Sequence, residues 1–127
     1  MQTPSYYLPI MPYLVVERAH DFIHFMETVF GAEERMIVRR PDTSIMHGEI
    51  TIGNAAIMFT DASADYPAFP CSMFLLVKDV DEIYSKGLLN GAVSLQEVDD
   101  REYGRSAGFK DAWGNVWWIT QIAEQSL

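Results

Sequence analysis

Two ionisable residues alternate along one short segment of the sequence. His47 and Glu49 are separated by Gly48 and followed by Ile50. Successive side chains of a β-strand point to opposite faces, so His47 and Glu49 would share one face and Ile50 would lie on the other. A histidine can act as a general acid or base, and a carboxylate can orient it. We therefore take His47 and Glu49 as candidate catalytic or ligand-contacting residues. The alternative is a solvent-facing pair on an antiparallel strand.

The other residues with metal-binding or nucleophilic side chains give weaker indications. His20 and His24 lie four residues apart, a spacing that can bind zinc on a helix, but they fall on a polar helix face with no third ligand nearby. We interpret them as surface residues. Cys71 is the only cysteine, so it cannot form an internal disulfide, and we interpret it as a buried or incidental thiol.

The first half of the sequence has the pattern of a βαβββ unit. An apolar, β-branched run over residues 8–16 predicts a strand. A helix with one apolar face follows and is expected to end at Gly31 in a left-handed cap. Three further strands are predicted over residues 33–39, 45–52 and 55–60.

The second half repeats this plan. A strand is predicted over residues 72–77, and Asp79 is expected to cap a helix that ends near Gly91. Three strands follow, over residues 94–98, 105–110 and 116–121. Landmark residues, such as Val16 with Val77, recur at an offset of about 60 residues, which indicates an internal duplication.

The predicted fold is therefore α+β, with two tandem βαβββ modules forming a cupped mixed sheet. We expect one domain over residues 1–127, with module 1 at about 8–61 and module 2 at about 71–122. The helix of each module covers one sheet face, so the other face needs a second sheet or a ligand. This arrangement predicts a cleft between the modules.

Composition and charge exclude several classes of protein. The chain is 49% hydrophobic, unlike a disordered protein, and its formal net charge of -9 would repel nucleic acids and anionic lipids. No apolar run approaches the roughly 20 residues that a membrane-spanning helix needs. The first residues lack the basic and apolar regions of a signal peptide, which predicts a cytoplasmic protein.

Two sequence segments, together with the paired modules, resemble the glyoxalase/bleomycin resistance protein/dioxygenase superfamily, also called the vicinal oxygen chelate superfamily. The segment YGRSAGFKDAWGNVWWI (103–119) resembles the final hairpin of its PhnB-like and bleomycin-resistance-like branch, and HGEITIGN (47–54) is similar to the same branch. The resemblance covers nearly the whole chain. It implies the fold more strongly than a function, because this scaffold hosts isomerases, dioxygenases, thiol transferases and drug-binding proteins.

In metal-dependent members of this superfamily, His and Glu side chains from four equivalent strands bind a divalent ion. Alignment on the repeated landmarks puts these places at or within one residue of Met11, Met58, Ser72 and Trp118. A thioether is a poor ligand for such metals and an indole has no lone pair to offer. We therefore predict no cofactor and the loss of the family metal site. A displaced divalent metal bound through His47, Glu49 and Asp61 remains the alternative.

The preferred interpretation is a metal-free protein that binds a small aromatic or amphipathic molecule in the cleft and sequesters a drug or metabolite. As the resemblance implies, we expect a homodimer. Trp117 should point to the opposite sheet face and belong to the core. The candidate ligand-binding residues are Tyr13, His47, Glu49, Met58, Phe74, Tyr103, Arg105, Trp113 and Trp118. The alternatives are a metal-dependent lyase, isomerase or dioxygenase at His47 and Glu49, and an orphan relative whose own side chains fill the cleft.

Overall fold

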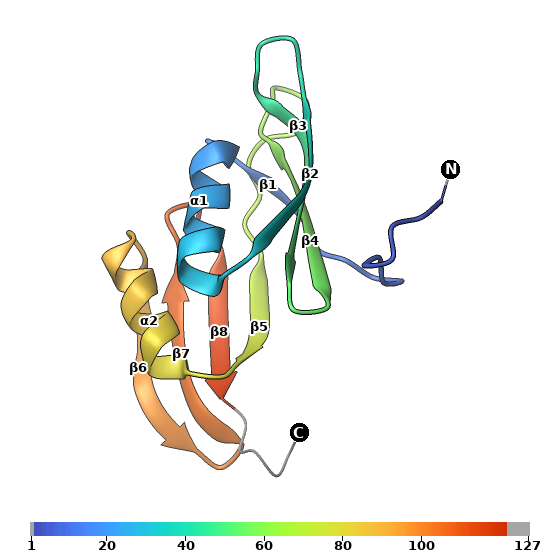
Figure 1. Cartoon of the computed structure of the whole chain (residues 1–127). Coiled ribbons are helices and arrows are strands. Elements are labelled where there is room, and N and C mark those ends of the chain that lie inside the picture. Colours follow the sequence, from blue (N-terminus) through green and yellow to red (C-terminus); the bar gives the residue numbers. More distant parts are fainter. Residues whose placement is uncertain (1, 122–127) are drawn as a thin grey trace. The chain divides into compact units, whose positions relative to one another are not determined.

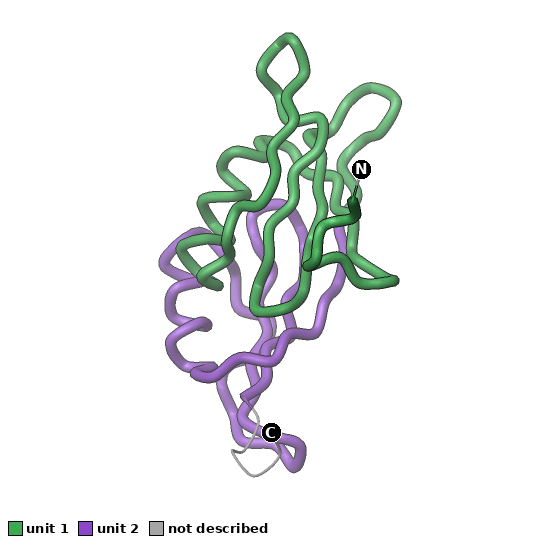
Figure 2. The backbone as a smooth tube through the Cα atoms, turned by 45° about the vertical axis from the view of Figure 1, so that its right-hand side comes forward, with its two compact units in different colours: residues 1–69 green, residues 70–127 purple. Residues whose placement is uncertain are grey.

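The computed structural model describes residues 2–121, and the chain divides into two compact units, residues 1–69 and 70–127 (Figure 2). Each unit contains one helix and one four-stranded mixed sheet. This confirms the predicted α+β fold of two βαβββ modules. Within the described residues, no helix is both long and apolar enough to cross a membrane.

The sheet of unit 1 has the strand order β1-β4-β3-β2 (Figure 1). Its elements are β1 (Tyr13–Val16), α1 (Ala19–Phe30), β2 (Glu33–Arg39), β3 (Ile45–Ile52) and β4 (Ala55–Asp61). Strand β1 runs parallel to β4, and the other pairs are antiparallel. The strand predicted over residues 8–16 is correct only for its second half. Pro9 and Pro12 have no backbone N–H to give to a sheet, which accounts for the later start.

Helix α1 covers one face of this sheet and forms the core of unit 1 with it. Phe22 of α1 and Phe59 of β4 are both completely buried, and their rings meet edge to face with centroids 5.5 Å apart. Gly48 on β3 makes room for Phe59, because a Cβ atom at this position would lie 2.3 Å from that ring. The helix ends as predicted at Gly31, which adopts a left-handed conformation with φ of 67°.

The sheet of unit 2 has the corresponding strand order β5-β8-β7-β6. Its elements are β5 (Ser72–Val77), α2 (Val80–Leu89), β6 (Val93–Arg101), β7 (Gly104–Lys110) and β8 (Val116–Gln121). Strand β6 extends beyond the predicted 94–98, because its charged end, including Asp100 and Arg101, still pairs with β7.

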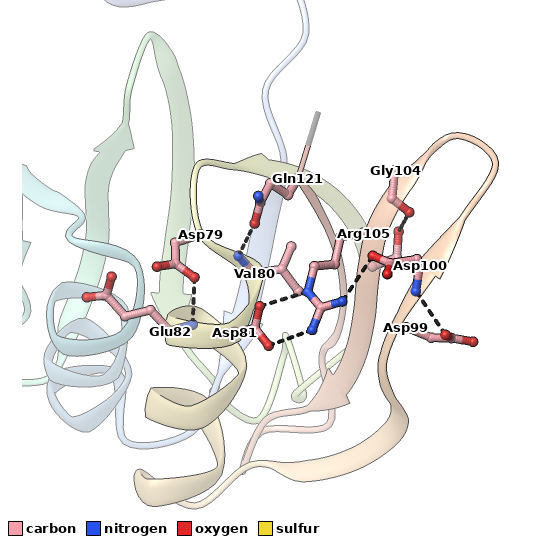
Figure 3. A network of polar contacts seen from close by, with 10 residues as sticks. Asp79, Val80, Asp81, Glu82, Asp99, Asp100, Gly104, Arg105 and Gln121 are labelled. Atoms are coloured by element: carbon pink, nitrogen blue, oxygen red, sulfur yellow. Dashed lines mark hydrogen bonds and ion pairs between the residues drawn. The ribbon is translucent and has the colours of Figure 1, made fainter. Parts of the chain in front are cut away.

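Two side chains hold the start of α2. The carboxylate of Asp79 accepts a hydrogen bond from the backbone N–H of Glu82 at 3.1 Å, as expected of an N-cap. The side-chain oxygen of Gln121, at the end of β8, accepts a second one from the N–H of Val80 at 3.0 Å (Figure 3). The last strand of unit 2 is thus tied to the first turn of its helix.

Candidate functional site

A buried carboxylate lies on the sheet face of unit 1 that α1 does not cover. Glu49 is completely buried and pairs in register with Met36 and Met58. Its Oε1 atom accepts a hydrogen bond from the hydroxyl of Tyr6 at 2.5 Å, and its Oε2 atom accepts one from the hydroxyl of Tyr7. Both tyrosines come from the segment that precedes the sheet.

His47 supplies the third hydrogen bond to this carboxylate. Its Nε2 atom lies 2.7 Å from Oε2 of Glu49. On the other side of the imidazole, Nδ1 lies 3.0 Å from the hydroxyl of Tyr13 on β1. The structure therefore joins three of the candidate residues, Tyr13, His47 and Glu49, in one hydrogen-bonded chain. Met58 pairs in register with both Tyr13 and Glu49 and belongs to the same cluster.

The hydrogen bonds decide the protonation of this cluster. Burial raises the pKa of Glu49, but the hydrogen bonds from Tyr6, Tyr7 and His47 outweigh it, and the net pKa is lowered. Burial, with the hydrogen bond to Glu49, raises the pKa of Tyr6 to about 12, and the hydrogen bond to Glu49 is the main cause that raises the pKa of Tyr7. At neutral pH an ionised Glu49 thus accepts from two neutral phenols.

These residues do not fit a binding site for the divalent metal that metal-dependent members of the superfamily contain. Both oxygens of Glu49 already accept hydrogen bonds from protein donors. Asp61, a possible ligand of a displaced metal, accepts hydrogen bonds from the backbone N–H groups of Ala19 and Ile45 at 2.8 and 2.7 Å, so its role is to hold the backbone. Across residues 2–121, no three His, Cys, Asp or Glu side chains lie together as a metal site requires.

The uncovered sheet face of unit 2 is aromatic instead. Phe74 on β5 and Trp118 on β8 pair in register, with 62% and 38% of their surfaces exposed. The indole N–H of Trp118 donates to the hydroxyl of Ser72 at 3.2 Å. Gly108 on β7 makes room for the indole, because a Cβ atom there would lie 2.4 Å from its ring. Trp117 is buried, and its indole N–H donates to Asp111.

The other three candidates of unit 2 lie on one further strand and in two turns. Arg105 pairs in register with Gln121, at the far end of β8 from the β7–β8 turn that contains Trp113. Tyr103 is exposed in the turn between β6 and β7. The three residues are therefore spread over different strands and turns of unit 2.

Arg105 is engaged by acidic side chains (Figure 3). Its guanidinium donates to both carboxylate oxygens of Asp81 on α2, at 2.8 and 3.0 Å, and to Asp100 on β6 at 3.0 Å. The hydrogen bond from Arg105 lowers the pKa of Asp81, and the two carboxylates raise the pKa of Arg105. Arg105 connects the helix to the sheet.

Tyr6 and Tyr7 are the site residues that sequence reasoning missed. They lie 43 and 42 residues from Glu49 in the chain, outside any predicted element. Arg35, with its guanidinium carbon 5.7 Å from the centre of the Tyr6 ring, was missed too. Adjacent tyrosines carry no period or motif, so no signal in this single sequence connects them with a residue of β3.

Comparison with known proteins decides the family. The model of the Glyoxalase/Bleomycin resistance protein/Dioxygenase superfamily matches residues 8–119. The chain belongs to this superfamily. An uncharacterised relative from Mycobacterium bovis is 28% identical, with 88% of this chain and 82% of the relative covered.

Solved structures of other proteins show the same fold. Protein PA1353 from Pseudomonas aeruginosa superposes with a TM-score of 0.77 at 20% identity, covering 91% of this chain and 98% of that one. The PhnB protein from Bacillus cereus gives 0.75 at 17% identity, covering 91% and 100%. At such identities the likeness concerns the fold alone, and function must be argued from the residues of this chain.

Proposed function

We propose that this member of the superfamily binds a small aromatic or amphipathic molecule, and that Phe74 and Trp118 form the surface that the molecule contacts. The observation that supports this proposal is the exposure of the two paired rings on a sheet face. Aromatic side chains give a large, rigid contact area, and ligand sites are mostly lined by such side chains with a few polar groups.

Charge indicates which molecules would be preferred. The formal net charge of -9 attracts cations and repels anions. A cation placed over an aromatic face gains a further attraction from the ring. We therefore expect a cationic aromatic ligand to bind more tightly than an anionic one of similar size. Sequestration of a drug or metabolite of this class, without a metal ion, is the function proposed.

Titration with two dyes of opposite charge tests the proposal. Berberine is a cationic aromatic probe, and 8-anilinonaphthalene-1-sulfonate is an anionic one. We expect berberine to bind more tightly, and Trp118→Ala to weaken it about tenfold, because burying a large ring stabilises by about 1.5–3 kcal/mol. Dye fluorescence reports binding without depending on the protein's tryptophans.

A matched control distinguishes binding at this surface from nonspecific binding to exposed apolar side chains. Leu89 is 84% exposed on α2 of the same unit, so Leu89→Ala removes apolar surface away from the aromatic pair. This variant should bind berberine like the parent chain. Equal loss in both variants, or no loss in Trp118→Ala, would refute the assigned surface.

Two other outcomes would replace this function. We expect a homodimer in which the aromatic pair stays accessible. If the dimer seen by sedimentation dissociates on Trp118→Ala, a second copy of the chain covers the aromatic pair and no ligand surface is left there. Stoichiometric metal in the purified protein, lost on His47→Ala, would establish a metal-dependent lyase, isomerase or dioxygenase instead. Elemental analysis measures this directly.

A further inference from the structure

The hydrogen-bonded chain of unit 1 has a defined direction. Glu49 is ionised at neutral pH and can only accept, so Nε2 of His47 must carry the proton that lies between them, at 2.7 Å. A neutral imidazole with a proton on Nε2 has a lone pair on Nδ1. Whenever His47 is neutral, the hydroxyl of Tyr13, 3.0 Å away, therefore donates to Nδ1.

This direction leaves Tyr13 with its oxygen lone pairs for other molecules. The proton of its hydroxyl is committed to His47, and 47% of the residue's surface is exposed. The buried end of the chain is an anion, because the hydrogen bonds from Tyr6, Tyr7 and His47 outweigh burial and lower the pKa of Glu49. An exposed acceptor is thus connected through an imidazole to a fixed negative charge.

We propose that Tyr13, His47 and Glu49 form a proton relay that removes a proton from a hydroxyl group or a carbon acid of a bound molecule. The bond between the substrate atom and its hydrogen breaks as that proton passes to the Tyr13 oxygen. The Tyr13 proton moves to Nδ1 of His47 in the same step. The product is an anion of the substrate, a neutral Tyr13 and an imidazolium paired with the Glu49 carboxylate.

The surroundings of Tyr13 favour a coupled transfer over a free phenolate. Burial raises the pKa of Tyr13 and Glu49 adds to this, while the charge of Arg40 opposes it. Arg40 itself donates to Thr60 and to the backbone carbonyl of Asp61. Tyr13 therefore keeps a proton at neutral pH and would exchange one proton for another. In this relay Tyr13 is the catalytic residue, and Glu49 is a positioning residue that acts through His47.

The Kemp elimination of 5-nitrobenzisoxazole tests the relay without knowledge of the natural substrate. In this reaction a base removes the hydrogen on carbon 3, the N–O bond breaks, and a coloured cyanophenolate leaves. General-base catalysis contributes typically 10²–10⁴-fold. We therefore expect both Tyr13→Phe and His47→Gln to lower kcat/KM at least about tenfold, with the folded state checked by circular dichroism.

The control variant is His24→Gln, which removes an exposed histidine from α1 of the same unit. It should react like the parent chain. Loss in His47→Gln with full activity in Tyr13→Phe would show that His47 acts directly and would overturn the role of Tyr13. Parent-like rates in both variants would overturn the relay.

Nitrogen NMR of the histidine side chains provides a test that needs no substrate. The proposal requires neutral His47 to carry its proton on Nε2. Replacing Glu49 with Gln should weaken this preference, because an amide N–H can donate to Nε2, and a purely structural role of Glu49 predicts no such change. A parent imidazole protonated on Nδ1 would refute the proposed direction. None of these results depends on ligand binding at Phe74 and Trp118.

Discussion

The two units share one topology and differ in what their uncovered sheet faces carry. In unit 1 the residue of β3 that pairs with Met58 is Glu49, a buried carboxylate that is hydrogen-bonded to tyrosine and histidine side chains. In unit 2 the residue of β7 that pairs with Trp118 is Gly108, and the indole occupies the space where a side chain would lie. The uncovered face of unit 1 thus carries a hydrogen-bonded polar cluster, and that of unit 2 carries exposed aromatic rings.

Glycines on corresponding strands serve opposite faces in the two units. Gly48 makes room for Phe59 beneath α1, whereas Gly108 makes room for Trp118 on the uncovered face. Beneath α2, the glycine that makes room lies on the helix: a Cβ atom at Gly87 would lie 2.5 Å from the ring of Phe109. The two units thus share one strand pairing pattern, but different glycines and rings fill the space on corresponding sheet faces.

The largest expected difference concerns the turns before the last strand of each unit. Asp111 accepts hydrogen bonds from the backbone N–H groups of Trp113 and Asn115, from the Asn115 side chain and from the indole of Trp117. We expect Asp111→Ala to lower the free energy of unfolding by about 3 kcal/mol, because several buried donors lose their partner.

The matched change in unit 1 is Asn54→Ala, in the shorter β3–β4 turn. Asn54 is exposed, and the expected loss is below about 0.5 kcal/mol. Urea unfolding followed by circular dichroism measures both. Similar losses at the two turns would mean that the Asp111 network does not stabilise unit 2 more than solvent would.

Adding a methyl group to the two glycines should separate the two faces. Gly48→Ala is expected to cost about 2 kcal/mol, because the ring of Phe59 is completely buried against Phe22 and cannot move aside. Gly108→Ala should cost about 1 kcal/mol or less, because the partly exposed indole of Trp118 can swing outward. Thermal unfolding compares the variants, and a larger loss for Gly108→Ala would contradict this view of the two faces.

A smaller difference in stability is expected between substitutions at the last residues of β4 and β8. Asp61 ends β4 and binds two backbone N–H groups, whereas Gln121 ends β8 and binds one, in a helix start that Asp79 also caps. We expect Asp61→Ala to cost about 1.5 kcal/mol and Gln121→Ala about 0.5 kcal/mol. Hydrogen exchange at Ala19 and Val80 reports each helix start separately, and equal acceleration at both would reject the ranking.

The sequence predicts the fold well, because the fold depends on local signals. The apolar face of α1, the left-handed Gly31 and the cap at Asp79 are all confirmed. The site depends on contacts between distant residues. Alternation puts His47 and Glu49 on one face, but only the folded chain brings the hydroxyls of Tyr6 and Tyr7 to that carboxylate. Sequence patterns contain no information on such a contact.

The alternative of a displaced metal site also depends on contacts that residue type alone does not predict. Asp61 was a possible metal ligand because it is a carboxylate at a strand end, yet both of its oxygens bind backbone N–H groups. The same residue type can hold a metal or the start of a helix. Which of these it does depends on the neighbouring donors, and Ala19 is one of them because β1 pairs in parallel with β4 and puts the start of α1 beside Asp61.

The smallest effect concerns the two buried carboxylates, which should respond to acid with opposite signs. Hydrogen bonds lower the pKa of Glu49 below its ordinary 4.5, so its contribution to stability is present above that pH and is lost as the pH falls through the folded value. Burial, partly offset by hydrogen bonds, raises the pKa of Asp111 above 3.8, so the folded chain binds a proton first and stability increases as the pH falls towards 3.8. Urea unfolding between pH 3 and pH 7 should therefore show a weaker acid loss in Glu49→Gln and a stronger one in Asp111→Asn than in the parent chain. Each change in slope should stay below the limit of about 1.4 kcal/mol per pH unit for one proton. A stronger acid loss in both variants than in the parent chain would show that burial, and not the hydrogen bonds, governs the charge of Glu49, and the relay would then lose its anionic end.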